Sequence, residues 1–288
     1  MTKSKGKSAP PAPRSPAFAI ISDIHSNLEA LQAVLDDIDT RGITEIVCLG
    51  DLTGYGANPC ECLDLIRTRC RLTLMGNHDH AVLYEPTNFN LPAEKACYWT
   101  RQMLEAEPDP AVRAARWKFL GELPVRVKEG DVLFVHASPR RPLNEYIFPE
   151  DVFTNPQKVI ANFERLDARL CFVGHTHQPG VFLDDPYFDP PNELLDAPFY
   201  EVEDERAIIN VGSVGQPRDR DQRASYVVVH RRPDAADGAE SLVDAALRSS
   251  VERVEFVRVE YDLEQTVQKI LAEPALDDLL GNRLYDGR

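Results

Sequence analysis

Residues 17–51 read AFAIISDIHSNLEALQAVLDDIDTRGITEIVCLGD, and they hold two apolar runs separated by a segment with helical spacing. The runs Phe18–Ile21 and Glu45–Leu49 are short, which predicts buried strands. From Asn27 to Arg41 apolar residues recur every three or four positions, which predicts an amphipathic helix. Each strand is followed by a polar motif, S-D-I-H after the first and G-D after the second. The stretch therefore predicts a β-α-β unit with ligand-type side chains at the ends of its strands.

This alternation continues with a short helix near Cys60–Arg67 and a strand at Leu72–Met75, which is typical of a mostly parallel sheet covered by helices. Helix-favouring residues then extend from Pro92 to Leu120. We interpret the stretch at about residues 85–122 as a helical insertion. Near the end of the chain, Leu263–Leu280 predicts a closing helix.

The second half of the chain is rich in short apolar runs, several of them separated by Gly or Pro, which predicts many strands. These runs are Val125–Lys128, Val132–His136, Arg169–Val173, Val181–Leu183, Phe199–Val202, Ala207–Val211, Ser225–Val229 and Val254–Val259. The chain has no internal repeat, so the simplest arrangement is an α/β fold of two sheets covered by helices, in one domain over residues 17–288. We expect the proline-rich residues 1–16 to be a disordered tail and the acidic stretch 234–250 to be a hairpin excursion.

The composition of the 288 residues limits the classes of partner. A formal net charge of -15 argues against a nonspecific nucleic-acid binder or a membrane-surface protein, because both need a basic surface. No apolar run approaches the ~18 residues of a membrane span, and the first residues lack the apolar region of a signal peptide, so we expect a cytoplasmic protein. The six cysteines form no C-x-x-C pair and are expected to be reduced thiols. An anionic substrate would need bound divalent cations to attract it.

Six of the seven histidines fall in or beside short polar motifs that follow predicted strands. The motifs are S-D-I-H (22–25), G-D-L-T-G-Y-G (50–56), G-N-H-D (76–79), V-H-A-S-P (135–139) and G-H-T-H (174–177). Loops at the carboxyl ends of strands in α/β folds point side chains into a common crevice. Asp, His and Asn supply oxygen and nitrogen ligands suited to Mn, Fe, Zn, Ni or Co, and paired metals assist in-line displacements. The motifs together predict one binuclear metal site.

The series D-x-H, G-D, G-N-H-D, H and G-H-x-H resembles that of the calcineurin-like metallophosphoesterases, from about Phe18 to about Tyr226. The resemblance implies a four-layer αββα sandwich and hydrolysis of phosphate esters through attack by a metal-bridging hydroxide. It also implies two divalent metal ions as cofactors, with manganese as our first expectation and iron, zinc, nickel or cobalt as alternatives. The implied partner is a small phosphoester, and the net charge argues against a membrane or nonspecific nucleic acid as a further partner.

The resemblance also implies roles for individual residues of this chain. The implied ligands of the first metal are Asp23, His25 and His177. The implied ligands of the second metal are Asn77, His136 and His175, with Asp51 bridging the two ions. His78 is implied to be no ligand but to stand over the substrate, where it stabilises the phosphorane or protonates the leaving oxygen.

Substrate contacts are expected from Asn77 and from Arg218, whose guanidinium suits a phosphate oxygen. A role in bracing the fold is the alternative for Arg218. Arg140 and Arg141, after V-H-A-S-P, are weaker candidates for the same contact. In the segment 210–219 we expect Gly212, Ser213 and Gly215 to form a backbone nest that faces the metals.

The second motif separates branches of the family. Protein Ser/Thr phosphatases and symmetrical diadenosine tetraphosphatases carry G-D-x-V-D-R-G, whereas Gly54 and Tyr55 stand at the positions of its second Asp and its Arg. Because those two groups contact phosphate and orient the catalytic His, their replacement favours the branch of small bacterial phosphodiesterases. A phosphoprotein or dinucleoside polyphosphate phosphatase is the alternative. A non-catalytic metal-binding scaffold is a further one, although every motif position is filled.

Overall fold

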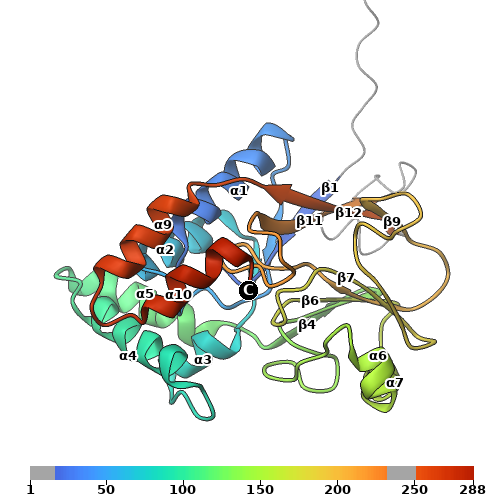
Figure 1. Cartoon of the computed structure of the whole chain (residues 1–288), viewed down its shortest axis with the longest axis horizontal. Helices are drawn as coiled ribbons and strands as arrows, with labels where there is room; N and C mark the ends of the chain where they lie inside the picture. Colours follow the sequence, from blue (N-terminus) through green and yellow to red (C-terminus); the bar gives the residue numbers. More distant parts are fainter. Residues whose placement is uncertain (1–16, 232–250) are drawn as a thin grey trace, which may run out of the picture.

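The computed structural model describes residues 17–231 and 251–288, so the predicted tail 1–16 and the predicted hairpin 234–250 lie outside the described residues (Figure 1). The described strands form two six-stranded sheets. The first sheet has the order β3 (Leu72–Thr73), β2 (Ile46–Cys48), β1 (Ala17–Ile21), β11 (Ala224–Arg231), β12 (Val251–Val259) and β9 (Phe199–Glu201). The second has the order β4 (Arg126–Glu129), β5 (Val132–Val135), β6 (Leu170–Val173), β10 (Ala207–Asn210), β7 (Gly180–Leu183) and β8 (Tyr187–Asp189).

The central strands are apolar on both faces because both faces are covered. Phe18 and Ile20 of β1 pack in the cluster between the two sheets, where Phe134 and Phe172 of the second sheet stack at 5.9 Å between ring centres. The alternate residues of β1 point to the opposite face and pack against helices. A strand buried on both sides reads as a continuous apolar run, which is why the sequence pattern located these strands well.

Helices α1 (Leu28–Thr40) and α2 (Pro59–Arg69) cover the outer face of the first sheet. Helix α1 begins after Asn27, whose side chain accepts a hydrogen bond from the Ala30 amide at 3.1 Å. Its apolar face, which includes Leu31 and Val34, packs on the sheet with Ala19 and Ile21.

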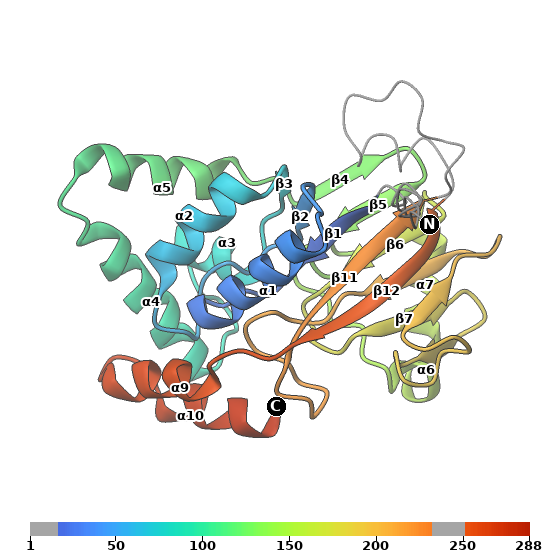
Figure 2. The same ribbon diagram turned by 90° about the horizontal axis from the view of Figure 1, so that it is seen from above.

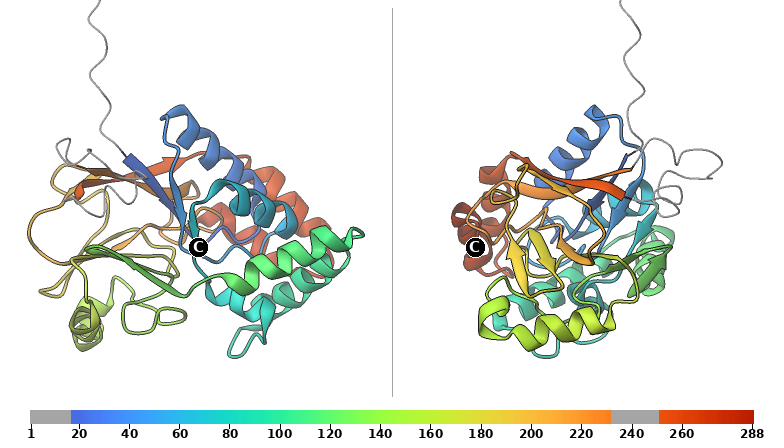
Figure 3. Two further views of the ribbon diagram at one scale, coloured as in Figure 1. Left: turned by 180° about the vertical axis from the view of Figure 1, so that it is seen from behind. Right: turned by 90° about the vertical axis from the view of Figure 1, so that its right-hand side faces the viewer.

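Two helices cover the outer face of the second sheet, α6 (Asp151–Thr154) and α7 (Pro156–Arg165). Val159 and Phe163 of α7 pack against Cys171 and Ile208 of the sheet. The layers lie one above another in Figure 3 (right), from the blue α1 at the top to the yellow-green α7 at the bottom. The predicted four-layer αββα sandwich is therefore confirmed.

A further group of helices lies beside the layers (Figure 2). The group consists of α3 (Asn77–Leu83), α4 (Leu91–Glu105), α5 (Pro110–Glu122), α9 (Leu263–Ala272), α10 (Asp278–Asn282) and the 3-10 helix η2 (Arg283–Asp286). Helices α4 and α5 occupy the stretch predicted as a helical insertion. The helical conformation is interrupted between them, and Asp109 caps the start of α5. The C-terminal helices pack on α4 in a cluster that includes Trp99, Leu280 and Tyr55. Within the described ranges, no helix combines the length and the apolar character needed to cross a membrane.

The expectation of a mostly parallel sheet is wrong, because both sheets are mixed. In the first sheet β1 pairs in parallel with β2 and β2 with β3, whereas β11, β12 and β9 are added antiparallel. In the second sheet the parallel pairs are β5 with β6 and β6 with β10. The parallel strands of each sheet end on the same side, and the loops that follow them carry the motifs.

Candidate metal centre

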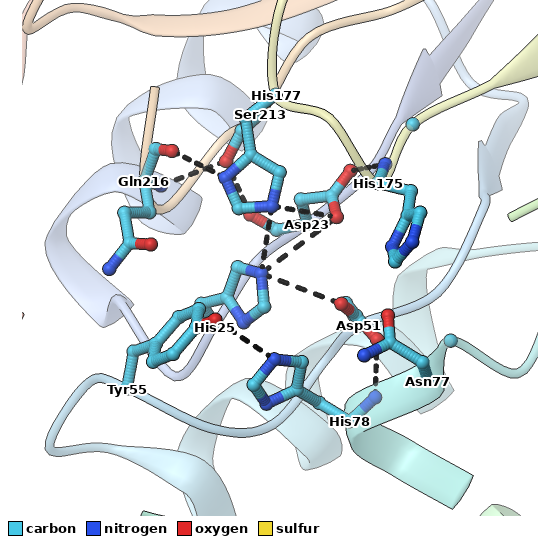
Figure 4. Close-up of polar contacts among 12 residues, drawn as sticks. Asp23, His25, Asp51, Tyr55, Asn77, His78, His175, His177, Ser213 and Gln216 are labelled. Atoms are coloured by element: carbon cyan, nitrogen blue, oxygen red, sulfur yellow. Dashed lines mark hydrogen bonds and ion pairs between the residues drawn. The ribbon is translucent and has the colours of Figure 1, made fainter. Parts of the chain in front are cut away.

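Five loops bring the predicted site residues to one point (Figure 4). In chain order these residues are Asp23 and His25 after β1, Asp51 after β2, Asn77 and His78 at the start of α3, His136 after β5, and His175 and His177 after β6. All are buried except Asn77, which is partly exposed. The loops therefore create an enclosed group of carboxylates, imidazoles and one amide.

Backbone strain is concentrated in these loops. Asp23, His25, Asp51, His175 and His177 all have φ between 47° and 67°, the left-handed region that side chains with a Cβ rarely adopt. Such conformations cost on the order of 1–3 kcal/mol each and persist where the surroundings enforce them. Hydrogen bonds between the loops do so here: the Asp23 amide donates to the Gly50 carbonyl at 3.0 Å, and the His25 amide donates to the Asp51 carbonyl at 2.9 Å.

Two glycines allow the carboxylates to lie close to neighbouring backbone. A Cβ on Gly76 would lie 2.0 Å from Oδ1 of Asp51, and a Cβ on Gly174 would lie 2.2 Å from Oδ2 of Asp23. Both distances are far below van der Waals contact. Each motif therefore needs its glycine for the approach of a carboxylate, not only for a turn.

Three acceptors face one another in the first group of predicted ligands. Nδ1 of His25 lies 3.0 Å from the Thr53 carbonyl oxygen, and Nδ1 of His177 lies 2.6 Å from the Gln216 carbonyl oxygen. These contacts require a proton on Nδ1, so Nε2 of each neutral ring carries a lone pair. The two Nε2 atoms are 3.2 Å apart, and that of His177 is 3.1 Å from Oδ1 of Asp23. A cation between them would satisfy all three.

The second group has the same character. Nδ1 of His136 lies 3.1 Å from the Leu49 carbonyl oxygen, which directs Nε2 toward Oδ1 of Asn77 at 3.1 Å. Oδ2 of Asp51 lies 3.4 Å from this Nε2 and 3.6 Å from Nε2 of His25, so its carboxylate stands between the two groups. Nε2 of His175 is buried and has no hydrogen-bond partner within the part of the chain that the structure describes. The donor set therefore fits two transition-metal ions that share Asp51.

The protonation of these groups follows from burial and from the two carboxylates. Burial lowers the pKa of His25, His175 and His177, which keeps the three rings neutral. Burial also opposes charge on His136, but the Asp51 carboxylate beside it raises the pKa of His136 to about 9, so this ring is charged in the metal-free protein and would release its Nε2 proton on binding a cation. Burial disfavours an ionised Asp51 as well, yet His136 and His78 hold its pKa well below the usual range. The carboxylate is thus ionised and ready to bind a cation.

Asp79, the last residue of G-N-H-D, holds the Asp51 loop in place. Its carboxylate accepts from the Leu52 amide at 3.0 Å, from the amide and hydroxyl of Thr53 at 3.2 and 3.0 Å, and from the Gly76 amide at 3.0 Å. The motif identified this residue, but its role as an acceptor for four donors was missed. The G-N-H-D loop thereby orients the Asp51 carboxylate as well as offering Asn77.

The expected backbone nest at Gly212, Ser213 and Gly215 is wrong. The Ser213 hydroxyl donates to the Asp23 carbonyl at 2.9 Å, and the Gly215 amide donates to the same oxygen at 2.8 Å. The Gly212 amide donates to Oδ1 of Asn210 at 2.9 Å. The amides of Gly212 and Gly215 are therefore already used within the protein, and the segment braces the S-D-I-H loop in place of forming the expected nest.

His78 lies beside the ligands with a neighbour on each ring nitrogen. Its Nε2 is 3.1 Å from the Tyr55 hydroxyl, and its Nδ1 is 3.8 Å from Sγ of Cys97. Arg218 donates from Nη2 to the same Tyr55 hydroxyl at 3.3 Å and to Oε1 of Gln216 at 2.8 Å. The sequence marked Tyr55 only as a departure from the protein phosphatases. Its contact with His78 was missed, because the loop that turns Tyr55 toward α3 has no pattern of its own.

A cleft of about 500 Å³ opens over the centre. Its buried lining residues include Tyr55, His78 and His175, and its more exposed ones include Glu85, residues 87–90, Leu143 and Tyr146. The Tyr146 ring stacks on that of His175 with 3.8 Å between ring centres. Arg140 pairs instead with Glu145, so this weaker candidate for a phosphate contact is engaged within its own loop.

Comparison with known proteins agrees with this geometry. A family model described as the calcineurin-like phosphoesterase superfamily domain matches residues 17–233. The chain belongs to this superfamily. It is 40% identical over 282 residues to an uncharacterized protein of Methanocaldococcus jannaschii, covering 94% of this chain and 98% of that protein. Members of the superfamily are phosphoesterases, so the chain is assigned to the phosphoester hydrolases.

Solved structures support the same fold. A metallophosphoesterase from Sphaerobacter thermophilus is similar with a TM-score of 0.74 and 36% identity, covering 96% of this chain and 100% of that one. A hypothetical protein from Pyrococcus horikoshii OT3 has a TM-score of 0.66 and 17% identity, covering 94% of this chain and 98% of that one. The second likeness shows the fold alone.

Proposed function

We propose that the chain is a binuclear metal-dependent phosphoesterase whose substrates are phosphodiesters. The observation that carries the proposal is the set of acceptors that face one another on both sides of Asp51, since cations between them would satisfy their lone pairs. In the proposal the first ion is held by Asp23, His25 and His177. The second is held by Asn77, His136 and His175, and Asp51 contributes to both. Manganese is the first expectation, with iron, zinc, nickel and cobalt as alternatives that take the same kinds of ligand.

We place His78 off the metals. Its ligand atom lies close enough to those of His25 and Asp51 to form a third possible group. Both of its ring nitrogens, however, already have neighbours, whereas Nε2 of His175 has none. A position beside the ions with Nε2 directed to a hydroxyl suits a group that transfers a proton.

When bound, the two ions would supply the positive charge that polarises the phosphorus–oxygen bonds of the ester. The chain's own residues would orient the substrate and move the proton. The Asn77 amide lines the cleft next to the ligands and would contact a phosphate oxygen. His78 would deliver a proton from Nε2 to the leaving oxygen. The buried floor of the cleft would keep bulk water away from this transfer.

The preference for phosphodiesters rests on the second motif. Gly54 and Tyr55 stand where the phosphoprotein phosphatases carry an Asp and an Arg. A phosphomonoester has one more negative charge than a diester, and that arginine would have faced it. Its replacement by a neutral phenol favours the substrate with less charge on the reacting phosphate.

A panel of substrates tests the proposal. Protein reconstituted with Mn²⁺ should hydrolyse bis(p-nitrophenyl) phosphate, with slower turnover of p-nitrophenyl phosphate and little of a phosphoserine peptide. Asp51→Asn and His136→Ala should each lower turnover by orders of magnitude, on the order of 10² or more, because each removes a ligand. A clear preference for the phosphopeptide would overturn the diester assignment, and near wild-type turnover of either variant at saturating metal would overturn the ligand assignment.

A further inference from the structure

Two arginines beside Tyr55, a residue that lines the cleft, differ from most others in this acidic chain. Arg116, for example, donates to Asp64 at 2.6 Å and to Glu107 at 2.9 Å, and similar ion pairs hold Arg126 and Arg223. In contrast, Arg218 and Arg283 have no Asp or Glu side chain within salt-bridge distance among the residues that the structure describes. Other described arginines, such as Arg253 over the Phe199 ring, also lack a carboxylate partner, but Arg218 and Arg283 lie against the same residue of the cleft.

Both guanidinium groups lie against Tyr55. The central carbon of the Arg218 guanidinium is 5.8 Å from the centre of the Tyr55 ring, and that of Arg283 is 5.5 Å away. Tyr55 lines the cleft over the metal centre, and so does Tyr146, which is close enough to Arg283 to influence its pKa. The Tyr55 hydroxyl lies between Arg218 and His78, so the Arg218 guanidinium is one side chain away from His78.

Arg283 comes from a part of the chain outside the matched family domain. It begins η2, in the C-terminal helices drawn in red in Figure 1, whereas the family model ends at residue 233. The cluster of Tyr55 with Leu280 and Leu284 fixes these helices against the loop after β2. The C-terminal segment therefore adds a positive charge to a site that the rest of the domain builds.

The positions of these two charged groups lower the stability of the folded protein. Nε of Arg218 is buried without a hydrogen-bond partner among the described residues, and Nε of Arg283 donates to the backbone oxygen of Arg288 at 2.6 Å. Burial, together with the neighbouring charge of Arg218, lowers the pKa of Arg283 to about 10. Two partly buried like charges destabilise the ligand-free protein, and an anion between them would reverse that effect.

We infer that Arg218 and Arg283 form an anion subsite beside the metal centre, and that the substrate carries a second phosphoryl group next to the one that is cleaved. This inference rests on the proposed function. The charge of two divalent ions would be largely balanced by Asp23, Asp51 and the reacting phosphate, which leaves the two guanidinium groups unbalanced. An adjacent phosphoryl group supplies both the charge and the acceptor oxygens that guanidinium groups bind well. The substrate class is thus a phosphodiester in which one of the two linkages of the reacting phosphate is to another phosphate, as in an ester of diphosphate or of a longer phosphate chain.

Binding of two non-hydrolysable probes tests the subsite without relying on turnover. Methylenediphosphonate and methylphosphonate are titrated by calorimetry into Mn²⁺-loaded protein, with free Mn²⁺ in constant excess so that chelation is the same for every variant. Wild type should bind the diphosphonate more tightly. Arg283→Gln and Arg218→Gln should each weaken diphosphonate binding by about 10- to 100-fold, the scale of a lost charge-assisted hydrogen bond. Methylphosphonate binding should change much less.

Two matched variants separate the subsite from general electrostatics and from folding. Arg223→Gln removes the same charge near the C-terminal helices, but from an arginine paired with Asp221, and should leave the preference for diphosphonate intact. Arg283→Lys keeps the charge and should retain part of the preference. If Arg283 acts only through its contact with the Arg288 backbone, Arg283→Lys will lose the preference for diphosphonate as Arg283→Gln does. Equal loss of affinity for both probes in the Gln variants, or no loss, would overturn the inference.

Binding and hydrolysis together distinguish failure of the subsite inference from failure of the proposed function. If wild type hydrolyses the ester panel, and neither arginine variant changes the ratio of the affinities for diphosphonate and methylphosphonate, the subsite is wrong and the proposed phosphoesterase activity stands. Diphosphonate binding that depends on both arginines, with no hydrolysis of any ester, supports the subsite as an anion site and removes the catalytic proposal.

Discussion

At the scale of single residues, His78 is restrained by three contacts. Its amide donates to Oδ1 of Asp51 at 2.8 Å, and Tyr55 and Cys97 adjoin its ring nitrogens. Burial lowers the pKa of His78 to about 4, even though the Asp51 carboxylate acts in the opposite direction. The ring is therefore neutral near neutral pH in the metal-free protein. An anionic phosphate beside the ring favours its charged form, so proton donation would require bound substrate.

His78→Gln should retain both ions and reduce turnover by a factor of order 10² to 10⁴, the usual scale for a general acid. The loss should shrink for esters with good leaving groups, because an aryl oxide of low pKa needs little protonation as it departs. Turnover of esters with a series of leaving groups, together with metal analysis of the variant, measures this. Tyr55→Phe, which removes only the hydroxyl that contacts Nε2, should cause a smaller loss.

Two results would contradict the role given to His78. Loss of metal from His78→Gln would make it a ligand, in agreement with its distance from His25 and Asp51. A loss of turnover that is independent of the leaving group would instead indicate electrostatic stabilisation of the transition state, without proton transfer.

Asp79 is the residue whose change should harm folding and metal binding together. Asp79→Asn replaces one acceptor oxygen by an NH₂ group that faces N–H and O–H donors of the Asp51 loop. We expect the free energy of unfolding to fall by about 2–4 kcal/mol, since buried donors lose their partner, and the metal content to fall as well. Urea unfolding and elemental analysis measure the two effects.

The matched control is Asp262→Asn. Asp262 caps α9 by accepting from the Gln265 amide at 3.0 Å, and Asn caps helices as well as Asp does. Its free energy of unfolding should change by less than about 0.5 kcal/mol. If Asp79→Asn is as harmless as this control, the carboxylate does not hold the Asp51 loop.

At the scale of helices and strands, sequence periodicity located the elements that are buried on both faces. Strands such as β1 and β10 begin and end within one or two residues of their predicted ranges, because their apolar runs are bounded by polar loops. Helix α3 was missed because the G-N-H-D motif that opens it resembles a loop. Helix α7 was overlooked although Pro156 at its start and the spacing of Val159 and Phe163 are helical signals.

The contacts of β12 with α1 and β11 can be tested because the charged side chain of Glu255 links these elements. Glu255 of β12 accepts from Nη1 of Arg41, at the end of α1, at 2.8 Å, and lies 3.2 Å from Nε2 of His230 on β11. The hydrogen bond with His230 lowers the pKa of Glu255 from 4.5 to about 2, against burial and with help from Arg41. A lowered pKa in the folded state stabilises the protein above pH 4.5, and this contribution is lost as the pH falls from 4.5 to about 2.

Glu255→Gln should therefore lower the free energy of unfolding at pH 7 by roughly 1 kcal/mol, and the difference from wild type should close as the pH falls toward 2. Urea unfolding at several pH values measures the difference. Glu122→Gln is the control, because Glu122 pairs with Lys118 on the surface at 3.8 Å, where both side chains are largely exposed. It should have almost no effect at any pH. If the difference in free energy of unfolding between Glu255→Gln and wild type stays constant with pH, the ionised form of Glu255 does not contribute to stability.

At the scale of the whole molecule, the motifs could predict a common site because each follows a strand, and strand ends converge in this kind of fold. The contact between Tyr55 and Arg283 could not be predicted in this way. It joins a loop after β2 to a helix at the end of the chain, and only the packing of the C-terminal helices on α4 brings the two together. The orientation of imidazoles by backbone carbonyls was also invisible in the sequence, because any residue supplies a carbonyl.

The proposed ligands come from both sheets, so metal binding should stabilise the molecule as a whole. Asp23 and Asp51 follow strands of the first sheet, and His136 and His175 follow strands of the second. Ions that bind only the folded state add about 2.7 kcal/mol per site at 100 times the dissociation constant. For a chain of this size each kcal/mol raises Tm by roughly 2–4 °C, so loading with Mn²⁺ should raise Tm by about 5 °C or more.

Asp51→Asn should remove most of this rise in Tm, because the variant weakens both sites at once. His230→Gln is the control: His230 lies on β11 and pairs with Glu255, away from the ligands, so its Tm should respond to Mn²⁺ as wild type does. Calorimetric melting with and without chelator measures the rise, and elemental analysis should find two ions per chain. A stoichiometry fixed at one ion would exclude the binuclear centre. A full rise in Tm for Asp51→Asn would show that the two groups of ligands bind independently, since loss of a shared carboxylate cannot leave both intact.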